Sequence, residues 1–206
     1  TQGAGPLTKS VAEEGTATWT ASELNATDVD PGDTLTWSVS SPATSGAATV
    51  SGSGASPSTF TYAPNADFNG SDSFVVQVAD GALTDTITVN VTVSAVNDAP
   101  VITQGTSVAV TMSEDGSPSA WVAPTVTATD GDTASGSLTW SVQTAASNGS
   151  ATVSGSGSSP STFNYAPNAD FNGSDSFVIA VSDGDTNASI TVTVTVTGVN
   201  DAPVIT

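Results

Sequence analysis

The chain has 206 residues, of which 20 are Asp or Glu and only one is Lys or Arg, so its formal net charge at pH 7 is −19. Without Cys or His it can hold neither a disulfide framework nor a zinc, copper or iron site of the usual kind. Its acidity excludes binding to nucleic-acid phosphates through Lys and Arg. No apolar run approaches the roughly 18 residues of a membrane span, so we expect no membrane insertion.

The predicted elements of the first half of the chain are all strands. Short runs rich in Thr and Val alternate apolar and polar residues, most strictly at Thr86–Val93, and this alternation is the period of a half-buried strand. Clusters of Gly, Pro, Asn, Asp and Ser separate the runs. We predict strands near residues 7–12, 16–26, 34–40, 46–51, 58–62, 73–79 and 84–95.

The second half of the chain repeats the first. The twelve residues APNADFNGSDSF occur at Ala63–Phe74 and again at Ala166–Phe177, and VNDAPVIT occurs at Val96–Thr103 and at Val199–Thr206. Repetition at a fixed period is typical of tandem arrays of one structural unit. The sequence thus reads as two units of a longer array.

We predict two domains, residues 1–99 and 100–206, with a linker around residues 95–102. About seven short strands in roughly 100 residues are typical of an immunoglobulin-like fold. The predicted fold class is therefore all-β, with two tandem Greek-key β-sandwiches arranged end to end. Because there is no Cys, packing alone must hold each sandwich together.

Acidic residues gather in turn-like clusters that recur in both repeats. Carboxylates that lie close together repel one another, and Lys9 is the only basic side chain. Oxygen ligands from flexible turns suit Ca²⁺, which takes six to eight of them. We therefore predict Ca²⁺ as the cofactor. The predicted ligands are Glu13, Glu14, Asp28, Asp30, Asp33, Asp67, Asp80, Asn97 and Asp98 in the first repeat, and Glu114, Asp130, Asp132, Asp170, Asp183, Asn200 and Asp201 in the second.

Each acidic cluster has a simpler interpretation as a solvated turn. Asp72 and Asp175 in particular can cap a turn through their side chains, as Asx residues often do. The dodecamer is predicted to be structural, with Phe68 and Phe74 packing in the core.

Three motifs together resemble cadherins. ATDVDPGDTLTWSV is similar to the cadherin stretch with an Asp-x-Asp pair between two strands, VADG to the Asp after the sixth strand, and VNDAPV to the interdomain linker. The resemblance is strongest to the bacterial cadherin-like and Ig-like tandem repeats of giant secreted adhesins, many of the RTX type.

This resemblance implies that Ca²⁺ sits between consecutive domains. An upstream domain would contribute Glu13 or Glu14 together with Asp67 or, as an alternative, Asp72. The linker would contribute Asn97 and Asp98, and a downstream domain Asp130, Asp132 and Asp183. Two further linker positions depart from the cadherin pattern, since Ala95 and Ala99 stand where cadherins have an acid and an amide. We therefore expect one or two ions at each junction.

The function that these features predict is structural. The chain lacks the residues for Ser-His-Asp or Cys-His catalysis, and we predict that it is not an enzyme. We predict calcium-stabilised extender repeats of a giant bacterial surface adhesin, extracellular and monomeric, whose partners are neighbouring repeats of the same chain. The alternative is a cadherin-like module that recognises a glycan or another adhesin copy, for which Trp19 and Trp121, expected to be partly exposed, are the candidate contacts.

Overall fold

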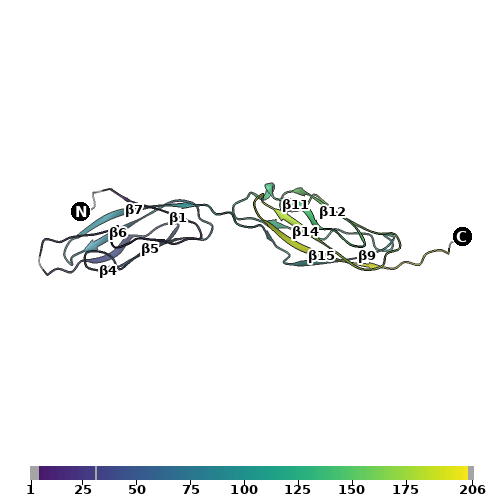
Figure 1. Cartoon of the computed structure of the whole chain (residues 1–206), viewed down its shortest axis with the longest axis horizontal. Helices are drawn as coiled ribbons and strands as arrows, with labels where there is room; N and C mark the ends of the chain where they lie inside the picture. The colour runs from purple at the N-terminus through teal and green to yellow at the C-terminus, as the bar shows by residue number, and fades with distance from the viewer. Residues whose placement is uncertain (1–4, 31, 204–206) are drawn as a thin grey trace. The chain divides into compact units, whose positions relative to one another are not determined.

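The computed structural model describes residues 5–30 and 32–203, and the chain divides into two compact units (Figure 1). Unit 1 runs up to Val96 and unit 2 begins at Asn97, so the division lies within the predicted linker, residues 95–102. The described residues of both units form strands and no α-helix. The predicted fold class, two tandem all-β sandwich domains, is confirmed.

Unit 1 is a sheet that folds over on itself. Its strands are β1 (Leu7–Ala12), β2 (Ala17–Thr18), β3 (Thr36–Ser41), β4 (Gly46–Ser53), β5 (Thr59–Pro64), β6 (Gly70–Ala79) and β7 (Thr84–Ser94). Their order is β1-β7-β6-β3-β4-β5-β2, and only the β1–β7 pair is parallel. Because β4 pairs with β3 only near one end but with β5 along its length, the strands separate into two packed layers.

The core of unit 1 lies between these layers. Phe60 and Tyr62 of β5 contact Phe74 of β6, with ring centroids 6.2 and 5.9 Å apart. Alternate residues of β7 complete the core, and Val89 and Val91 are at most 1% exposed. The period-2 alternation seen in the sequence therefore separates the core face of each strand from its solvent face.

Unit 2 repeats this arrangement. Its elements are β8 (Val101–Ile102), β9 (Ser107–Ser113), β10 (Ala128–Thr129), a short 3₁₀ helix (Ser135–Ser137), β11 (Thr139–Thr144), β12 (Gly149–Ser156), β13 (Thr162–Pro167), β14 (Gly173–Ser182) and β15 (Asn187–Thr197). Six strands are ordered β13-β12-β11-β14-β15-β9, with β9 parallel to β15, and β8 pairs separately with β10. The parallel edge strand is thus a feature of both repeats.

One predicted strand, residues 16–26, is wrong over most of its length. Only Ala17–Thr18 is a strand, and a turn follows. The carboxylate of Glu23 accepts hydrogen bonds from the backbone N–H and the hydroxyl of Thr20, at 2.6 and 2.9 Å. These local bonds compete with strand pairing, as Thr side chains commonly do near turns.

The repeated dodecamer holds a buried hydrogen-bond network. Asp175 is 5% exposed, and its carboxylate accepts hydrogen bonds from the Tyr165 hydroxyl at 2.8 Å and from the backbone N–H groups of Ser147, Asn148 and Ser176 at 2.9–3.1 Å. Asp72 has the same role in unit 1. The structure therefore supports the capping interpretation of both residues, because each carboxylate is already satisfied by donors of its own unit.

The expectation that both Trp19 and Trp121 are partly exposed is wrong for Trp19. It is only 5% exposed and stacks on Phe60 with ring centroids 4.3 Å apart. The ammonium of Lys9, which forms an ion pair with Glu23, lies 5.6 Å from the centre of the Trp19 ring. Trp121 is half-buried and donates its Nε1–H to the carbonyl of Phe163.

The substitution Gly149→Ala is expected to destabilise unit 2 by about 1–3 kcal/mol. A Cβ at Gly149 would lie 2.6 Å from ring atoms of Tyr165, and this ring cannot move away without breaking its hydrogen bond to Asp175. Urea unfolding of the variant measures the change. The control is Gly136→Ala, where a Cβ meets nothing within 4 Å. Equal stabilities of the two variants would contradict the prediction.

Candidate metal centre

The first candidate centre lies at the start of unit 2, where three loops meet. Asn97 and Asp98 precede β8, Asp130 and Asp132 follow β10, and Asp183 lies in the turn between β14 and β15. The backbone N–H of Asp98 donates to Asp132 Oδ2 at 2.7 Å, and Asn97 Nδ2 donates to Asp183 Oδ2 at 3.0 Å. The structure therefore brings together five of the predicted ligands.

Asp130 has an oxygen that no protein group satisfies. Its Oδ1 accepts the backbone N–H groups of Asp132 and Thr133 at 3.0 and 2.7 Å. Its Oδ2 is buried and, alone among the buried side-chain nitrogens and oxygens of the described residues, has no hydrogen-bond partner. Burying an unpaired carboxylate oxygen is costly. A cation bound to this oxygen would remove that cost, so the donor set fits a hard metal ion.

Asp183 is held ionised by its own turn. Its Oδ1 accepts the backbone N–H groups of Asp185 and Thr186, both at 2.7 Å. The backbone N–H of Thr186, then the side chains of Asn97 and Thr186, hold the pKa of Asp183 well below its usual range. A negative charge is therefore fixed next to the linker at neutral pH.

Unit 1 carries the equivalent acidic loop. Carboxylate oxygens of Asp28, Asp30 and Asp33 all lie within 4.8 Å of one another, and all three residues are exposed. Asp80 accepts the backbone N–H groups of Leu83 and Ala82 at 2.7 Å, which lowers its pKa. The same turn geometry thus recurs at the two equivalent positions, Asp80 and Asp183.

At the opposite end of each unit lies a glutamate, which is buried in unit 1 (Glu13) and half-buried in unit 2 (Glu114). Glu13, 5% exposed, accepts a hydrogen bond from the backbone N–H of Val96, the last residue of unit 1. Glu114 accepts the equivalent N–H of Val199 at 2.6 Å. Both glutamates therefore fix the backbone directly before an Asn-Asp pair.

Two asparagines missed in the sequence also contact these glutamates. Asn69 Nδ2 lies 3.5 Å from Glu13 Oε2, and Asn172 Nδ2 lies 3.3 Å from Glu114 Oε2. Both belong to the repeated dodecamer, whose Asn-Gly pair reads simply as a turn. Only their identical placement in both copies could have singled them out.

At the end of unit 2, acidic side chains repel one another. Asp115, then burial, and then Asp170 and Glu114 raise the pKa of Asp201. This cluster includes three predicted ligands and adds Asp115, which the ligand prediction omitted although it adjoins Glu114. Such repulsion is what a bound cation would relieve.

All of the predicted ligands stay predictions, including those that the structure does not bring into a cluster. Glu14 is exposed, and Asp67 is exposed in a turn with a φ of 57°, as is Asp170, whose φ is 58°. Asn200 donates from its Nδ2 to the carbonyl of Asp201 at 3.1 Å.

Within the described ranges, no helix is both long and apolar enough to cross a bilayer.

These units are immunoglobulin-like β-sandwiches with acidic loops at their ends, and family comparisons refine this class. The family model of the bacterial cadherin-like domain matches residues 2–95, and that of the bacterial Ig domain matches residues 97–197. The chain is therefore a tandem of bacterial cadherin-like and Ig-like repeats. Both kinds of domain are typically non-enzymatic structural modules, and cadherin-like domains are usually extracellular and generally bind Ca²⁺. No curated protein matches the sequence.

The solved structures that match the chain include cadherins. Human protocadherin-24 EC1-2 is 14% identical over 95% of both chains, with a TM-score of 0.49. Drosophila N-cadherin EC1-4 is 13% identical over 93% of this chain and 48% of its own length, with a TM-score of 0.47. The endo-fucoidan hydrolase MfFcnA4 of glycoside hydrolase family 107 is 20% identical, with a TM-score of 0.37. This chain spans 28% of the hydrolase's length.

Proposed function

We propose that the chain consists of calcium-stabilised extender repeats of a bacterial surface adhesin. The observation that carries this proposal is the buried, unpartnered Oδ2 of Asp130, which lies in the loop that also contacts the linker through Asp132. The other oxygens of a Ca²⁺ shell would come from Asp98, Asp132 and Asp183. Carboxylates from separate loops and a set of oxygen ligands alone are what Ca²⁺ prefers.

In this proposal the ion fixes the linker to the repeat that follows it, and so joins consecutive repeats into a stiff array. Asn97 and Asp98 are part of unit 2, while Val96 is bonded to Glu13 of unit 1. The chain holds no Arg or His and one Lys, Lys9, so no abundant cationic side chain is present to offset these acids. Calcium is millimolar outside cells, and we place the repeats there.

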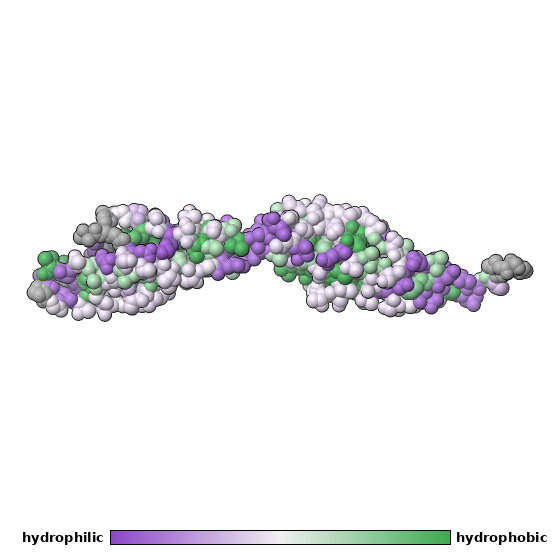
Figure 2. Space-filling view, in the orientation of Figure 1, coloured by the Kyte–Doolittle hydropathy of each residue, from purple (hydrophilic) through white to green (hydrophobic). Residues whose placement is uncertain are grey.

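The surface suits a spacer that does not adhere to its neighbours. Most of the surface visible in Figure 2 is pale, neither strongly hydrophobic nor strongly hydrophilic, because the outward positions of the strands are mainly Thr and Ser. The alternative role in glycan recognition loses one of its candidate contacts, since Trp19 is buried against Phe60. We also propose that the chain has no catalytic activity of its own.

The substitution Asp130→Asn is expected to weaken Ca²⁺ binding to one site by on the order of tenfold or more, because ligand charge tunes calcium affinity. Isothermal titration of the chain with CaCl₂ measures the effect. The matched control is Asp185→Asn, which removes one exposed charge from the same unit. Equal affinities of the two variants would show that the Asp130 oxygen is not a ligand.

A further inference from the structure

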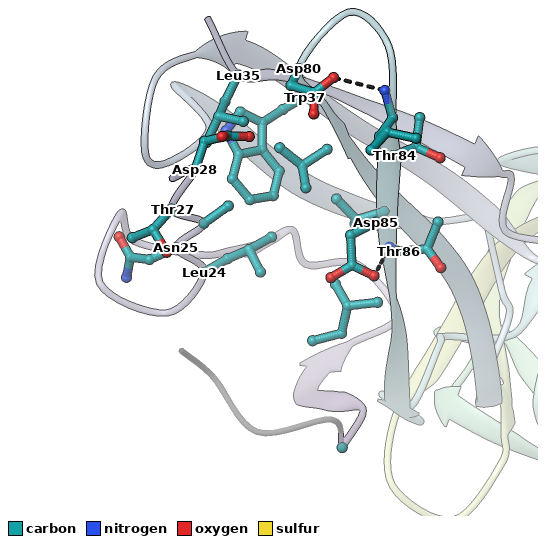
Figure 3. Close-up of a pocket in the computed structure, with 16 residues that line it drawn as sticks. Leu24, Asn25, Thr27, Asp28, Leu35, Trp37, Asp80, Thr84, Asp85 and Thr86 are labelled. Carbon is teal, nitrogen blue, oxygen red and sulfur yellow. Dashed lines mark hydrogen bonds between the residues drawn. The ribbon is translucent and has the colours of Figure 1, made fainter. Parts of the chain in front are cut away.

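Unit 1 has a groove, lined by both apolar and polar residues, that its described residues leave open. A cavity of about 450 Å³ lies between the segment of residues 24–28 and strands β3, β6 and β7 (Figure 3). We call it the unit 1 groove. Its apolar lining includes Leu24, Ala26, Leu35, Trp37, Val78 and Ile87.

In unit 2 the same place is filled by strand β8. Ile102 of this strand is 8% exposed and belongs to the core together with Leu138 and Trp140. It pairs with Ala128 of β10, and the next residue, Thr103, donates its backbone N–H to the carbonyl of Thr127 at 2.9 Å. Unit 2 thus shows which segment the groove accommodates.

The side chains that line the groove of unit 1 are less buried than the equivalent side chains around β8 in unit 2. In unit 2 the relevant side chains are at most 1% exposed, whereas their equivalents in unit 1 are only half-buried. The pairs, given as unit 2 and unit 1, are Ala128 and Ala26, Leu138 and Leu35, Val181 and Val78, and Ile190 and Ile87. An apolar strand entering the groove would remove this surface from water, which is favourable.

Among the described residues, no strand pairs with the segment of residues 26–27 that borders the groove. Ala26 donates to the carbonyl of Ala55 at 2.8 Å, just as Ala128 donates to Ser158 at 2.8 Å, so the two segments are placed alike within their units. Ala128–Thr129 forms strand β10 because β8 pairs with it. Residues 26–27 form no strand, since no described segment lies beside them.

The chain itself carries a second copy of the filling segment. Residues Val199–Thr206 have the sequence of Val96–Thr103, VNDAPVIT, and their described part belongs to no strand. We propose that the unit 1 groove binds the C-terminal Val204–Thr206 segment of a second copy of this chain, with Ile205 in the place that Ile102 takes in unit 2. Such contacts are head-to-tail, so they build open chains of molecules rather than closed dimers.

This self-association is weak and sensitive to charge. One buried side chain and a two-residue strand give a dissociation constant on the order of 100 μM or above, so the monomer predicted from the sequence prevails in dilute solution. The flanking Asp201 would approach Asp28 and Asp80, which also border the groove. Only this flanking contact rests on the proposed Ca²⁺ site, and the apolar contact does not.

Sedimentation velocity of the whole chain, from 10 μM to 1 mM with calcium, tests the proposal. The weight-average mass is expected to rise with concentration, and the rise should disappear in a chain that lacks residues 204–206 and in Ile205→Asp. These changes leave the described fold intact because they lie beyond it. A constant mass, or association that survives both changes, overturns the proposal.

Binding of a fluorescent APVIT peptide to the chain without residues 204–206, measured by anisotropy with calcium and with EDTA, separates the groove from the metal. If APVIT binds both with calcium and with EDTA, and the APVDT peptide does not bind, the groove proposal is supported even if the proposed Ca²⁺ site is wrong. No binding at millimolar peptide, or equal binding of APVDT, overturns the proposal. If APVIT binds but the whole chain never associates, the occupant is not a second copy, and a preceding segment of a longer chain becomes the candidate.

Discussion

Excess EDTA is expected to lower the melting temperature of the chain by about 10 °C or more relative to millimolar calcium. A ligand that binds only the folded state adds about 3–4 kcal/mol when its concentration is 100–1,000 times its dissociation constant. Each kcal/mol shifts the melting temperature of a domain of this size by about 4–8 °C. Without calcium, the charges of Asp98, Asp130, Asp132 and Asp183 would repel one another with no cation between them.

Two controls make this result specific. Magnesium at the same concentration should restore little stability, because it demands a small, nearly octahedral shell. In Asp130→Asn, the transition of unit 2 should become less sensitive to EDTA, whereas Asp185→Asn should behave like the unchanged chain. Superimposable melting curves with calcium and EDTA would reduce the acidic loops to solvated turns.

Replacing Asp175 by Ala is expected to cost about 3 kcal/mol or more of the free energy of unfolding, because hydrogen bonds to a charged group contribute about 1.5–3 kcal/mol each. The substitution leaves four donors without their acceptor, namely the Tyr165 hydroxyl and three backbone N–H groups. Leaving buried donors unsatisfied costs more than the bonds contribute on balance. Urea unfolding in EDTA measures this loss without any effect of calcium. The control Asp185→Ala, at an exposed position, should change stability by less than about 0.5 kcal/mol.

Lowering the pH should weaken the hydrogen-bond network around Asp175. Burial alone would raise the pKa of Asp175, but hydrogen bonds from Tyr165, Ser176, Asn148 and Ser147 outweigh burial and lower it. The stability that this carboxylate contributes is therefore complete above its ordinary pKa of 3.8 and is lost as the pH falls through the lowered folded-state pKa. In Asp175→Asn, the slope of stability against pH below about pH 4 should be shallower. Equal pH slopes for the variant and the unchanged chain would contradict the assignment of this stability to the Asp175 carboxylate.

The fold was predictable because its signals are local. Alternation along β7, and the same alternation one repeat later along β15, places apolar residues on one face wherever a strand forms. The shortening of the strand predicted at 16–26 was not predictable, because it depends on the hydrogen bonds from Thr20 to Glu23. It also depends on pairing, since no described segment lies beside residues 26–27 as a partner strand. Pairing partners that are distant in the chain leave no trace in the local pattern.

The candidate site was predictable in its residue types but not in its connections. The acids of the loops stand out because the chain has almost no bases. The distinction between Asp130, with an unsatisfied oxygen, and Asp175, with a full set of donors, depends on burial and on backbone N–H groups from other loops. Likewise, apart from its recurrence as Asn172, nothing in the sequence separates Asn69, which contacts Glu13, from an ordinary turn asparagine.

The attachment of Asn97 and Asp98 to unit 2 has a consequence for excising single repeats. A repeat delimited by its sandwich alone would begin near Val101, the first strand residue, and would discard the two linker residues that contact Asp132 and Asp183. The proposed ion-binding unit therefore extends beyond the sandwich by the linker residues Asn97 and Asp98. A fragment that begins at Asn97 carries these proposed ligands, whereas one that begins at Val101 lacks them.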